Sequence, residues 1–170
     1  MKNRALVVVD MQNDFVTGTL ANKEAQKIVP DVARYVKNWK GDIYFTRDTH
    51  YAKNYMSSME GKKLPVPHCI FKTEGWNIVP QIHVPAKAKV INKLTFGSKT
   101  LANTLATKKY DEIVFVGVCT DICVVSNVLL TKTTLPETPI KVVERLCAGV
   151  TVKSHKAALE TMKMCHIDVV

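Results

Sequence analysis

Residues 114–125 read VFVGVCTDICVV, an apolar run, two cysteines with Thr, Asp and Ile between them, and further apolar residues. The run before Cys119 is rich in Val and predicts a buried strand over 111–118. The residues after it predict a helix from about Asp121 to Thr131. Packing alone would explain cysteines at such a junction, because free Cys is among the most buried residue types. The other explanation is that one of the two sulfurs is a nucleophile.

Strand-like and helix-like segments alternate along the rest of the chain. The β-branched run RALVVVD at 4–10 is typical of a strand buried on both faces. The stretch 22–41 has apolar residues at helical spacing, which places Pro30 in the first turn of a helix and Gly41 at its end. We expect further strands at 42–48, 88–94, 140–146 and 167–170, and further helices at 99–109 and 151–165, the last with Thr151 as its N-cap.

Strands that alternate with helices pair in parallel through right-handed crossovers. We therefore expect an α/β fold, a three-layer α/β/α sandwich around a six-stranded, mainly parallel sheet, with 1–170 as one domain. Segment 49–86 is different, because it is irregular and rich in proline and predicts at most a short turn of helix. A loop of that length inside a compact domain is usually functional.

Composition limits the classes of function. The chain has 170 residues, 46% of them hydrophobic and 23% charged, which is ordinary for a globular protein. No stretch approaches the roughly 20 apolar residues that cross a bilayer. The first apolar run is too brief for a signal peptide, so we expect a cytoplasmic protein with no membrane partner. The net charge of +9 is spread along the chain without a nucleic-acid-binding motif, so we expect no nucleic-acid partner. Five scattered cysteines form no CxxC pair and should be free thiols in a reducing cytosol.

Reactive side chains follow the predicted strands. Asp10 ends the first strand, Asp48 ends the second with His50 two residues later, and Lys93 lies near the end of the third. Cys119 and Cys123 follow the fourth strand. Ligands of such folds bind beyond the carboxyl ends of the strands. We therefore expect an acid, an amine, a thiol and a pair of possible metal ligands, Asp48 and His50, at one edge of the sheet.

Cys123 is the candidate nucleophile. If Thr120 or Asp121 caps the following helix, Cys123 lies in the first helical turn, where N–H groups and the helix dipole favour a thiolate and hold an oxyanion. Asp10 is the candidate general base, since burial at a strand end raises the pKa of a carboxylate. Lys93 would balance these charges. The alternatives are a packed thiol, an acid that caps a turn, and a lysine that faces solvent.

Asp48, His50, Glu60 and His68 are candidate metal ligands. Carboxylates and imidazoles are suitable ligands for zinc or a similar divalent ion. Both histidines and both acids fall at the end of the second strand or in the long segment after it. The alternative is a set of polar contacts without a metal.

Four stretches of the sequence resemble the motifs of a known family. The stretches VVVDMQNDF (7–15), TRDTH (46–50), VINKLTFGS (90–98) and VGVCTDICV (116–124) are similar to those of the cysteine hydrolases of the isochorismatase-like superfamily, nicotinamidases among them. The likeness extends to the last predicted helix. It implies the isochorismatase-like, Rossmann-like form of the three-layer sandwich, and family members usually assemble as dimers or larger homo-oligomers.

Site residues can be carried over from this resemblance position by position. It assigns a catalytic triad to Asp10, Lys93 and Cys123. It also implies a cis peptide between Val118 and Cys119 that turns N–H groups toward the oxyanion. The substrate ring would contact Phe15, with Trp76 as a second wall.

The metal site of the family maps onto Asp48, His50 and His68, where the metal meets a pyridine nitrogen of the substrate. Many family members have a further histidine six residues after the histidine of the DxH motif, and here Met56 stands there. Glu60 is the candidate replacement.

The leading hypothesis is an amidase that cleaves a small, nicotinamide-like amide through a cysteine thioester and releases ammonia and an acid. Metal-free relatives hydrolyse carbamoyl or ureido compounds, which gives the first alternative. A thiol-based sensor or binding protein on the same fold is the second. A nucleic-acid binder is the third. The complete Asp–Lys–Cys set favours an enzyme, because the sensor and the binder do not need all three residues.

Overall fold

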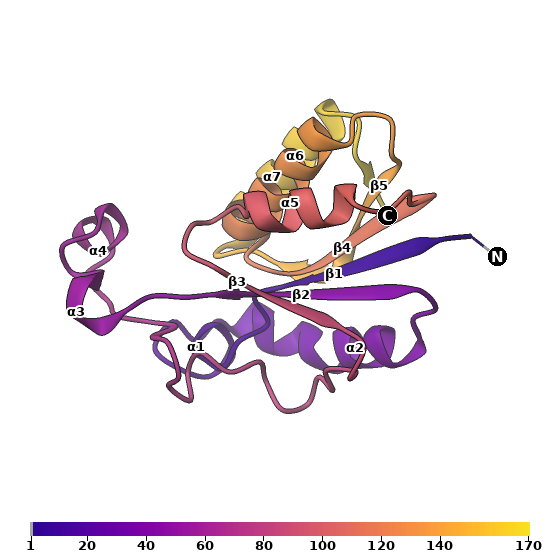
Figure 1. The fold of residues 1–170 in the computed structure, drawn as a ribbon. Helices are drawn as coiled ribbons and strands as arrows, with labels where there is room; N and C mark the ends of the chain where they lie inside the picture. Colours follow the sequence, from indigo (N-terminus) through magenta and orange to yellow (C-terminus); the bar gives the residue numbers. More distant parts are fainter. Residues whose placement is uncertain (1) are drawn as a thin grey trace.

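The computed structural model describes residues 2–170 and contains one six-stranded sheet in which every strand pair is parallel. The strand order is β3-β2-β1-β4-β5-β6 (Figure 1). The strands are β1 (Arg4–Val9), β2 (Asp42–Asp48), β3 (Lys89–Lys93), β4 (Glu112–Val118), β5 (Ile140–Ala148) and β6 (Asp168–Val169). The predicted α/β class is confirmed, and the sheet is wholly rather than mainly parallel.

Helices cover both faces of this sheet (Figure 1). One face carries α1 (Asn13–Val16) and α2 (Lys23–Asn38), and the other carries α5 (Lys99–Ala106), α6 (Val125–Thr134) and α7 (Val152–Met164). Side chains of β1 alternate between the two cores, since Leu6 and Val8 pack with α2 whereas Val7 and Val9 pack with the other three helices. The three-layer sandwich follows from this alternation.

Helix α2 begins and ends earlier than the sequence suggests. The Asn22 side chain accepts hydrogen bonds from the N–H groups of Glu24 and Ala25 and so caps the helix at that point. Pro30 therefore lies in the helix interior, and its predicted place in the first turn is wrong. Its ring is on the exposed face, where the lost N–H is least costly. The helix ends at Asn38, before Gly41, which has φ +141° and approaches the Arg4 carbonyl too closely for any side chain.

The long segment after β2 crosses the carboxyl end of the sheet. It contains two short helices, α3 (Ala52–Tyr55) and α4 (Met59–Lys63), where at most one turn was expected. Figure 1 shows both helices beyond the end of β2. Isolated bridges from His50 to Ile70 and from Gln12 to Ile78 tie the segment to the strand ends.

The junction between β4 and α6 is a π-helical turn, η1 (Thr120–Val124). The Val124 N–H donates to the Cys119 carbonyl at 3.0 Å, and the Val118–Cys119 peptide is cis, as expected. Cys119 holds the N-cap position, so neither Thr120 nor Asp121, the two residues considered for the cap, occupies it. Their side chains have other partners, because the Thr120 hydroxyl contacts His155 Nδ1 and the Asp121 carboxylate accepts from the Val150 N–H.

The remaining elements agree with the sequence apart from details. Thr151 caps α7 in a capping box with Ser154, as predicted at that position. Strand β5 continues to Ala148, and the short α1 was not anticipated. Within residues 2–170, no helix has the length and apolar character that a membrane span requires.

Candidate active site

Four neighbouring strands bring the candidate catalytic residues to one edge of the sheet. Asp10 follows β1, Asp48 ends β2, Lys93 ends β3, and Cys123 lies in η1 directly after β4. These strands are consecutive in the sheet order, so their carboxyl ends are adjacent. All four residues are buried, and Asp10 has no exposed surface.

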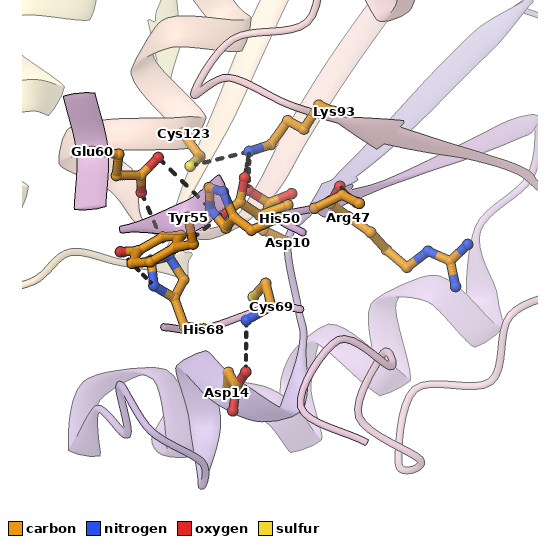
Figure 2. Close-up of polar contacts among 12 residues, drawn as sticks. Asp10, Asp14, Arg47, His50, Tyr55, Glu60, His68, Cys69, Lys93 and Cys123 are labelled. Carbon is orange, nitrogen blue, oxygen red and sulfur yellow. Dashed lines mark hydrogen bonds and ion pairs between the residues drawn. The ribbon is translucent and has the colours of Figure 1, made fainter. Parts of the chain in front are cut away.

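Lys93 is the centre of this group (Figure 2). Its Nζ lies 2.7 Å from Asp10 Oδ2, 3.2 Å from Asp48 Oδ1 and 3.4 Å from Cys123 Sγ. One cation therefore contacts both carboxylates and the thiol. The predicted Asp–Lys–Cys set is brought together, with Asp48 as an additional anion.

Burial and charge decide where the protons lie. Burial raises the pKa of the Cys123 thiol well above its ordinary value, and Asp10 raises it further, against the effect of Lys93. The pKa of Asp10 is also raised, mainly by burial. Burial lowers the pKa of Lys93, but Asp10, Cys123 and Asp48 outweigh it and raise that pKa. Burial and the two carboxylates thus oppose ionisation of the Cys123 thiol, while Lys93 favours it.

Asp10 is held by the neighbouring strand β2. The Thr46 hydroxyl donates to Asp10 Oδ1 at 2.6 Å, and the Asp10 N–H donates back to the Thr46 carbonyl at 3.3 Å. Asp10 has φ +48°, a left-handed conformation that an aspartate adopts at some cost. These bonds fix the carboxylate so that its second oxygen faces Lys93.

The candidate metal ligands form a compact cluster next to the triad. One ligand atom from each of Asp48, His50, Glu60 and His68 lies within 4.8 Å of the others. His50 Nε2 is 3.0 Å from Asp48 Oδ2, and His68 Nε2 is 3.5 Å from both Asp48 Oδ2 and Glu60 Oε1. Figure 2 shows Glu60, His50 and His68 converging from separate segments.

The chemistry of this cluster fits a divalent metal. The His68 Nδ1 is 2.8 Å from the Val66 carbonyl and donates to it, which leaves Nε2 directed at the two carboxylates. Burial lowers the pKa of His68, but hydrogen bonds with Asp48 and Glu60 outweigh it and raise the pKa to about 10. The two carboxylates thus concentrate negative charge at this point, which a divalent cation would offset. Two acids and two neutral imidazoles are a suitable donor set for zinc.

Glu60, and not Met56, is the fourth residue of the cluster. Met56 is 53% exposed and belongs to none of the contacts in the cluster. Glu60 lies in α4, which the Ser58 hydroxyl caps through the Gly61 N–H at 2.9 Å. The helix α4 therefore delivers the fourth candidate donor.

A cavity of about 450 Å³ is lined by Cys123 of the triad and by Asp48, Glu60 and His68 of the cluster. The predicted contacts Phe15 and Cys119 line it together with Cys123, and the Phe15 ring packs edge-on to His68. Its other lining residues include Leu20, Asn22, Lys23, Leu64, Phe96, Ile122 and Val150. A small molecule in this cavity would contact the thiol, the metal-type cluster and mainly apolar walls.

Trp76 and Val118 do not line this cavity. The Trp76 indole N–H donates to the Thr49 hydroxyl at 2.9 Å, and its ring lies under the Arg47 guanidinium. It therefore packs beneath the site and does not form the predicted second wall. Val118 is fully buried at the end of β4 and contributes only the peptide that precedes Cys119.

Two residues that support the site were not predicted. Gln12 Oε1 accepts from the Asp48 N–H at 2.7 Å, while its Nε2 donates to the carbonyls of Asp48 and Trp76, each at 2.9 Å. The Asp14 carboxylate accepts from the Cys69 N–H at 2.7 Å, next to His68. Both lie in the quoted motif VVVDMQNDF, but only a three-dimensional structure shows which main-chain groups they hold.

Comparisons with known proteins agree with this geometry. A model of the isochorismatase domain matches residues 4–170. The nicotinamidase/pyrazinamidase of Mycobacterium tuberculosis is 27% identical over 191 residues, which cover 98% of this chain and 98% of that protein. The nicotinamidase of Escherichia coli is 27% identical over 201 residues, covering 96% and 92%. The crystal structure of the Pyrococcus horikoshii pyrazinamidase in complex with zinc has a TM-score of 0.85 at 28% identity, covering 99% and 98%.

Proposed function

The chain belongs to the isochorismatase-domain family, and from this premise we propose that it hydrolyses a small, nicotinamide-like amide through a thioester on Cys123. The products are ammonia and a carboxylic acid. The observation that carries the proposal is the position of Lys93 Nζ, 2.7 Å from the Asp10 carboxylate and 3.4 Å from the sulfur of Cys123, a residue that lines the cavity.

The first half of the reaction forms the thioester. Asp10 takes the Cys123 thiol proton as the sulfur attacks the amide carbon, and N–H groups of the turn at 119–123 stabilise the oxyanion. Asp10 then gives this proton to the amide nitrogen, which leaves as ammonia. Burial raises the pKa of Asp10, and a raised pKa suits both steps, because it makes the carboxylate a better acceptor of the proton that it later returns.

The second half releases the acid. Asp10 takes a proton from water, and the hydroxide attacks the thioester carbon. The Cys123 sulfur departs and recovers the proton from Asp10, so the enzyme returns to its starting state. Lys93 remains charged throughout and offsets the negative charge as it moves between Asp10 and the Cys123 sulfur.

Asp48, His50, Glu60 and His68 would hold a divalent metal, for which zinc is our candidate. When bound, such an ion supplies a Lewis acid that can fix a ring nitrogen or a water molecule. Four converging donors therefore favour heteroaryl amides over the carbamoyl and ureido substrates of the metal-independent alternative. A thiol sensor needs an exposed thiol of low pKa. Burial instead raises the pKa of Cys119 to about 12, and that of Cys123 is also raised.

An ammonia-release screen tests the proposal. The purified protein is assayed with nicotinamide, pyrazinamide, carbamoyl compounds and ureido compounds, and its metal content is measured on the same sample. We expect the two heteroaryl amides to be hydrolysed by protein that contains about one metal per chain. Turnover of ring-free compounds alone, by protein without metal, would support the metal-independent alternative. Sedimentation of the same sample tests our further expectation of a homo-oligomer.

A further inference from the structure

Asn127 connects the turn that carries Cys123 to the loop that follows Lys93. It lies in α6, and its side chain is almost fully buried, at 1% exposure. Its Nδ2 donates to the Cys123 carbonyl at 2.7 Å and to the Phe96 carbonyl at 3.0 Å. Its Oδ1 accepts from the Ser98 N–H at 2.9 Å. The partners fix the orientation of the amide, because a carbonyl can only accept and an N–H can only donate.

These three bonds join separate parts of the candidate site. Cys123 supplies the sulfur, whereas Phe96 lines the cavity and lies in the loop that leaves β3 just after Lys93. The loop lies directly against α6, since a side chain at Gly97 would collide with Leu130. Asn127 is therefore a bridge between the nucleophile and the segment that carries its charged partner and one cavity wall.

We propose that Asn127 is a positioning residue that holds the Cys123 turn and the 94–98 loop in register with each other. Through its bond to the Cys123 carbonyl it fixes the direction of the sulfur, and through Phe96 and Ser98 it fixes the cavity wall. The proposal rests on the proposed function for its kinetic readout only. The accessibility of the Cys123 thiol provides a second readout that needs no substrate.

Two substitutions separate the two halves of the bridge. Asn127→Leu keeps the approximate size of the side chain but removes all three bonds. Asn127→Thr removes the bonds to the loop, but its hydroxyl can donate to the carbonyl of the preceding turn, which is that of Cys123. Ser126→Ala is the matched control, because the Ser126 hydroxyl makes the same kind of bond, to the Ile122 carbonyl at 2.6 Å, and the substitution keeps the Cβ that lies near Gly97 of the loop.

The experiment measures kcat and KM for the amide that the wild type hydrolyses best, together with thermal unfolding. It also measures the rate at which iodoacetamide modifies Cys123 relative to the exposed Cys165, by peptide mass spectrometry. For Asn127→Leu we expect kcat to fall roughly 10–100-fold, because small displacements of a nucleophile are costly. Its Cys123 should react about threefold faster or more, since the loosened turn exposes the thiol. For Asn127→Thr we expect a nearly unchanged kcat and reactivity but a raised KM, and for Ser126→Ala no change in any of these.

The outcomes are distinguishable. A folded Asn127→Leu variant with wild-type kcat, KM and Cys123 reactivity would overturn the proposal, as would equal changes in Ser126→Ala. If Asn127→Leu does not fold, the KM of Asn127→Thr decides, and an unchanged value contradicts the proposal. If the wild type releases no ammonia from any amide, the proposed function fails, while the relative reactivity of Cys123 in the variants still tests the bridge.

Discussion

Lys93 carries one positive charge and contacts two carboxylates and a thiol within 3.4 Å. With the thiol protonated, one cation faces two anions. Ionising Cys123 would add a third anion in a buried site, which explains why the pKa of that thiol is raised. In the proposed reaction Cys123 therefore loses its proton to a neighbour, and Asp10 is our candidate for the group that accepts it.

The two cysteines of the quoted stretch should differ in function. Cys123→Ala should lower ammonia release by roughly three orders of magnitude or more, because no other group can form the thioester. Cys119→Ala should keep most of the activity, since Cys119 lines the cavity but the sulfur hydrogen-bonded to Lys93 is that of Cys123. Activity and thermal unfolding of both variants check this. An inactive Cys119 variant beside an active Cys123 variant would reverse the assignment.

Asp10→Asn should separate the reactivity of the thiol from turnover. Removing the carboxylate removes a charge that raises the pKa of Cys123, while Lys93 remains and favours the thiolate. Alkylation of Cys123 at neutral pH should therefore become faster, and ammonia release should fall by about 10²–10⁴-fold for want of a general base. The pH profile of alkylation, with Cys165 as the internal reference, measures the first effect. Slower alkylation would show that Asp10 does not oppose ionisation of the thiol.

At the scale of elements, the strands were predictable and the junctions were not. The runs RALVVVD and DEIVFVGV could only be buried strands, and their parallel pairing places Asp10 and Cys123 together. The π-helical turn depends on the partners of Thr120 and Asp121 in α7 and in the loop before it, which are distant in sequence. The position of Pro30 was wrong because an earlier cap, Asn22, and continuous packing of the apolar face outweigh one missing N–H.

The amino end of the sheet should make folding sensitive to acid. Glu112 in β4 pairs with Arg4 of β1 at 2.6 Å and with Lys141 of β5 at 2.5 Å. Burial raises the pKa of Glu112, but these partners outweigh it and lower that pKa. A lowered pKa stabilises the fold above the unfolded value of about 4.3, and this stability is lost as the pH falls through the folded pKa.

Glu112→Gln should therefore lower the free energy of unfolding at pH 7 by about 1 kcal/mol, and the difference from the wild type should shrink toward pH 3. Denaturant unfolding at several pH values measures it. Glu160→Gln is the control, because its pair with Lys163 is exposed on α7. A deficit that is constant from pH 7 to pH 3 would contradict the ionic origin of the effect.

At the scale of the whole molecule, the segment 49–86 is what completes the candidate site. Its functional importance could be inferred from its length, and His50 and His68 from their residue type. The short helix that carries Glu60 could not be inferred from the sequence, because it depends on a single cap at Ser58. Nor could Gln12 or Asn127, whose partners are main-chain groups far away in sequence.

Metal binding should hold this segment to the sheet. Asp48 ends β2 while His50, Glu60 and His68 belong to the segment, so a bound ion would link two parts of the chain. Chelation should lower the melting temperature. The free energy of unfolding should fall by about 2.7 kcal/mol if the free metal had been present at 100 times its dissociation constant. It should also speed proteolysis within 49–86. Thermal unfolding and mass spectrometry of the fragments provide the readouts.

Glu60→Gln should weaken zinc binding roughly tenfold or more in a competition titration with a chromophoric chelator, since even indirect partners of a metal have effects of that size. The control is Glu74→Gln in the same segment, where the side chain is exposed and outside the cluster. Equal zinc affinity of Glu60→Gln and the wild type would exclude Glu60 as a ligand.

Both outer strands of the sheet limit how copies of this chain can aggregate. Strand β6 has only two residues, and β3 has five, with Lys89 exposed at its start. Short, charged edges are poor templates for the addition of a strand from another molecule. Copies of the chain should therefore not join their sheets into a continuous ribbon or fibril while folded, and any assembly in solution should be made by side chains of helices and loops.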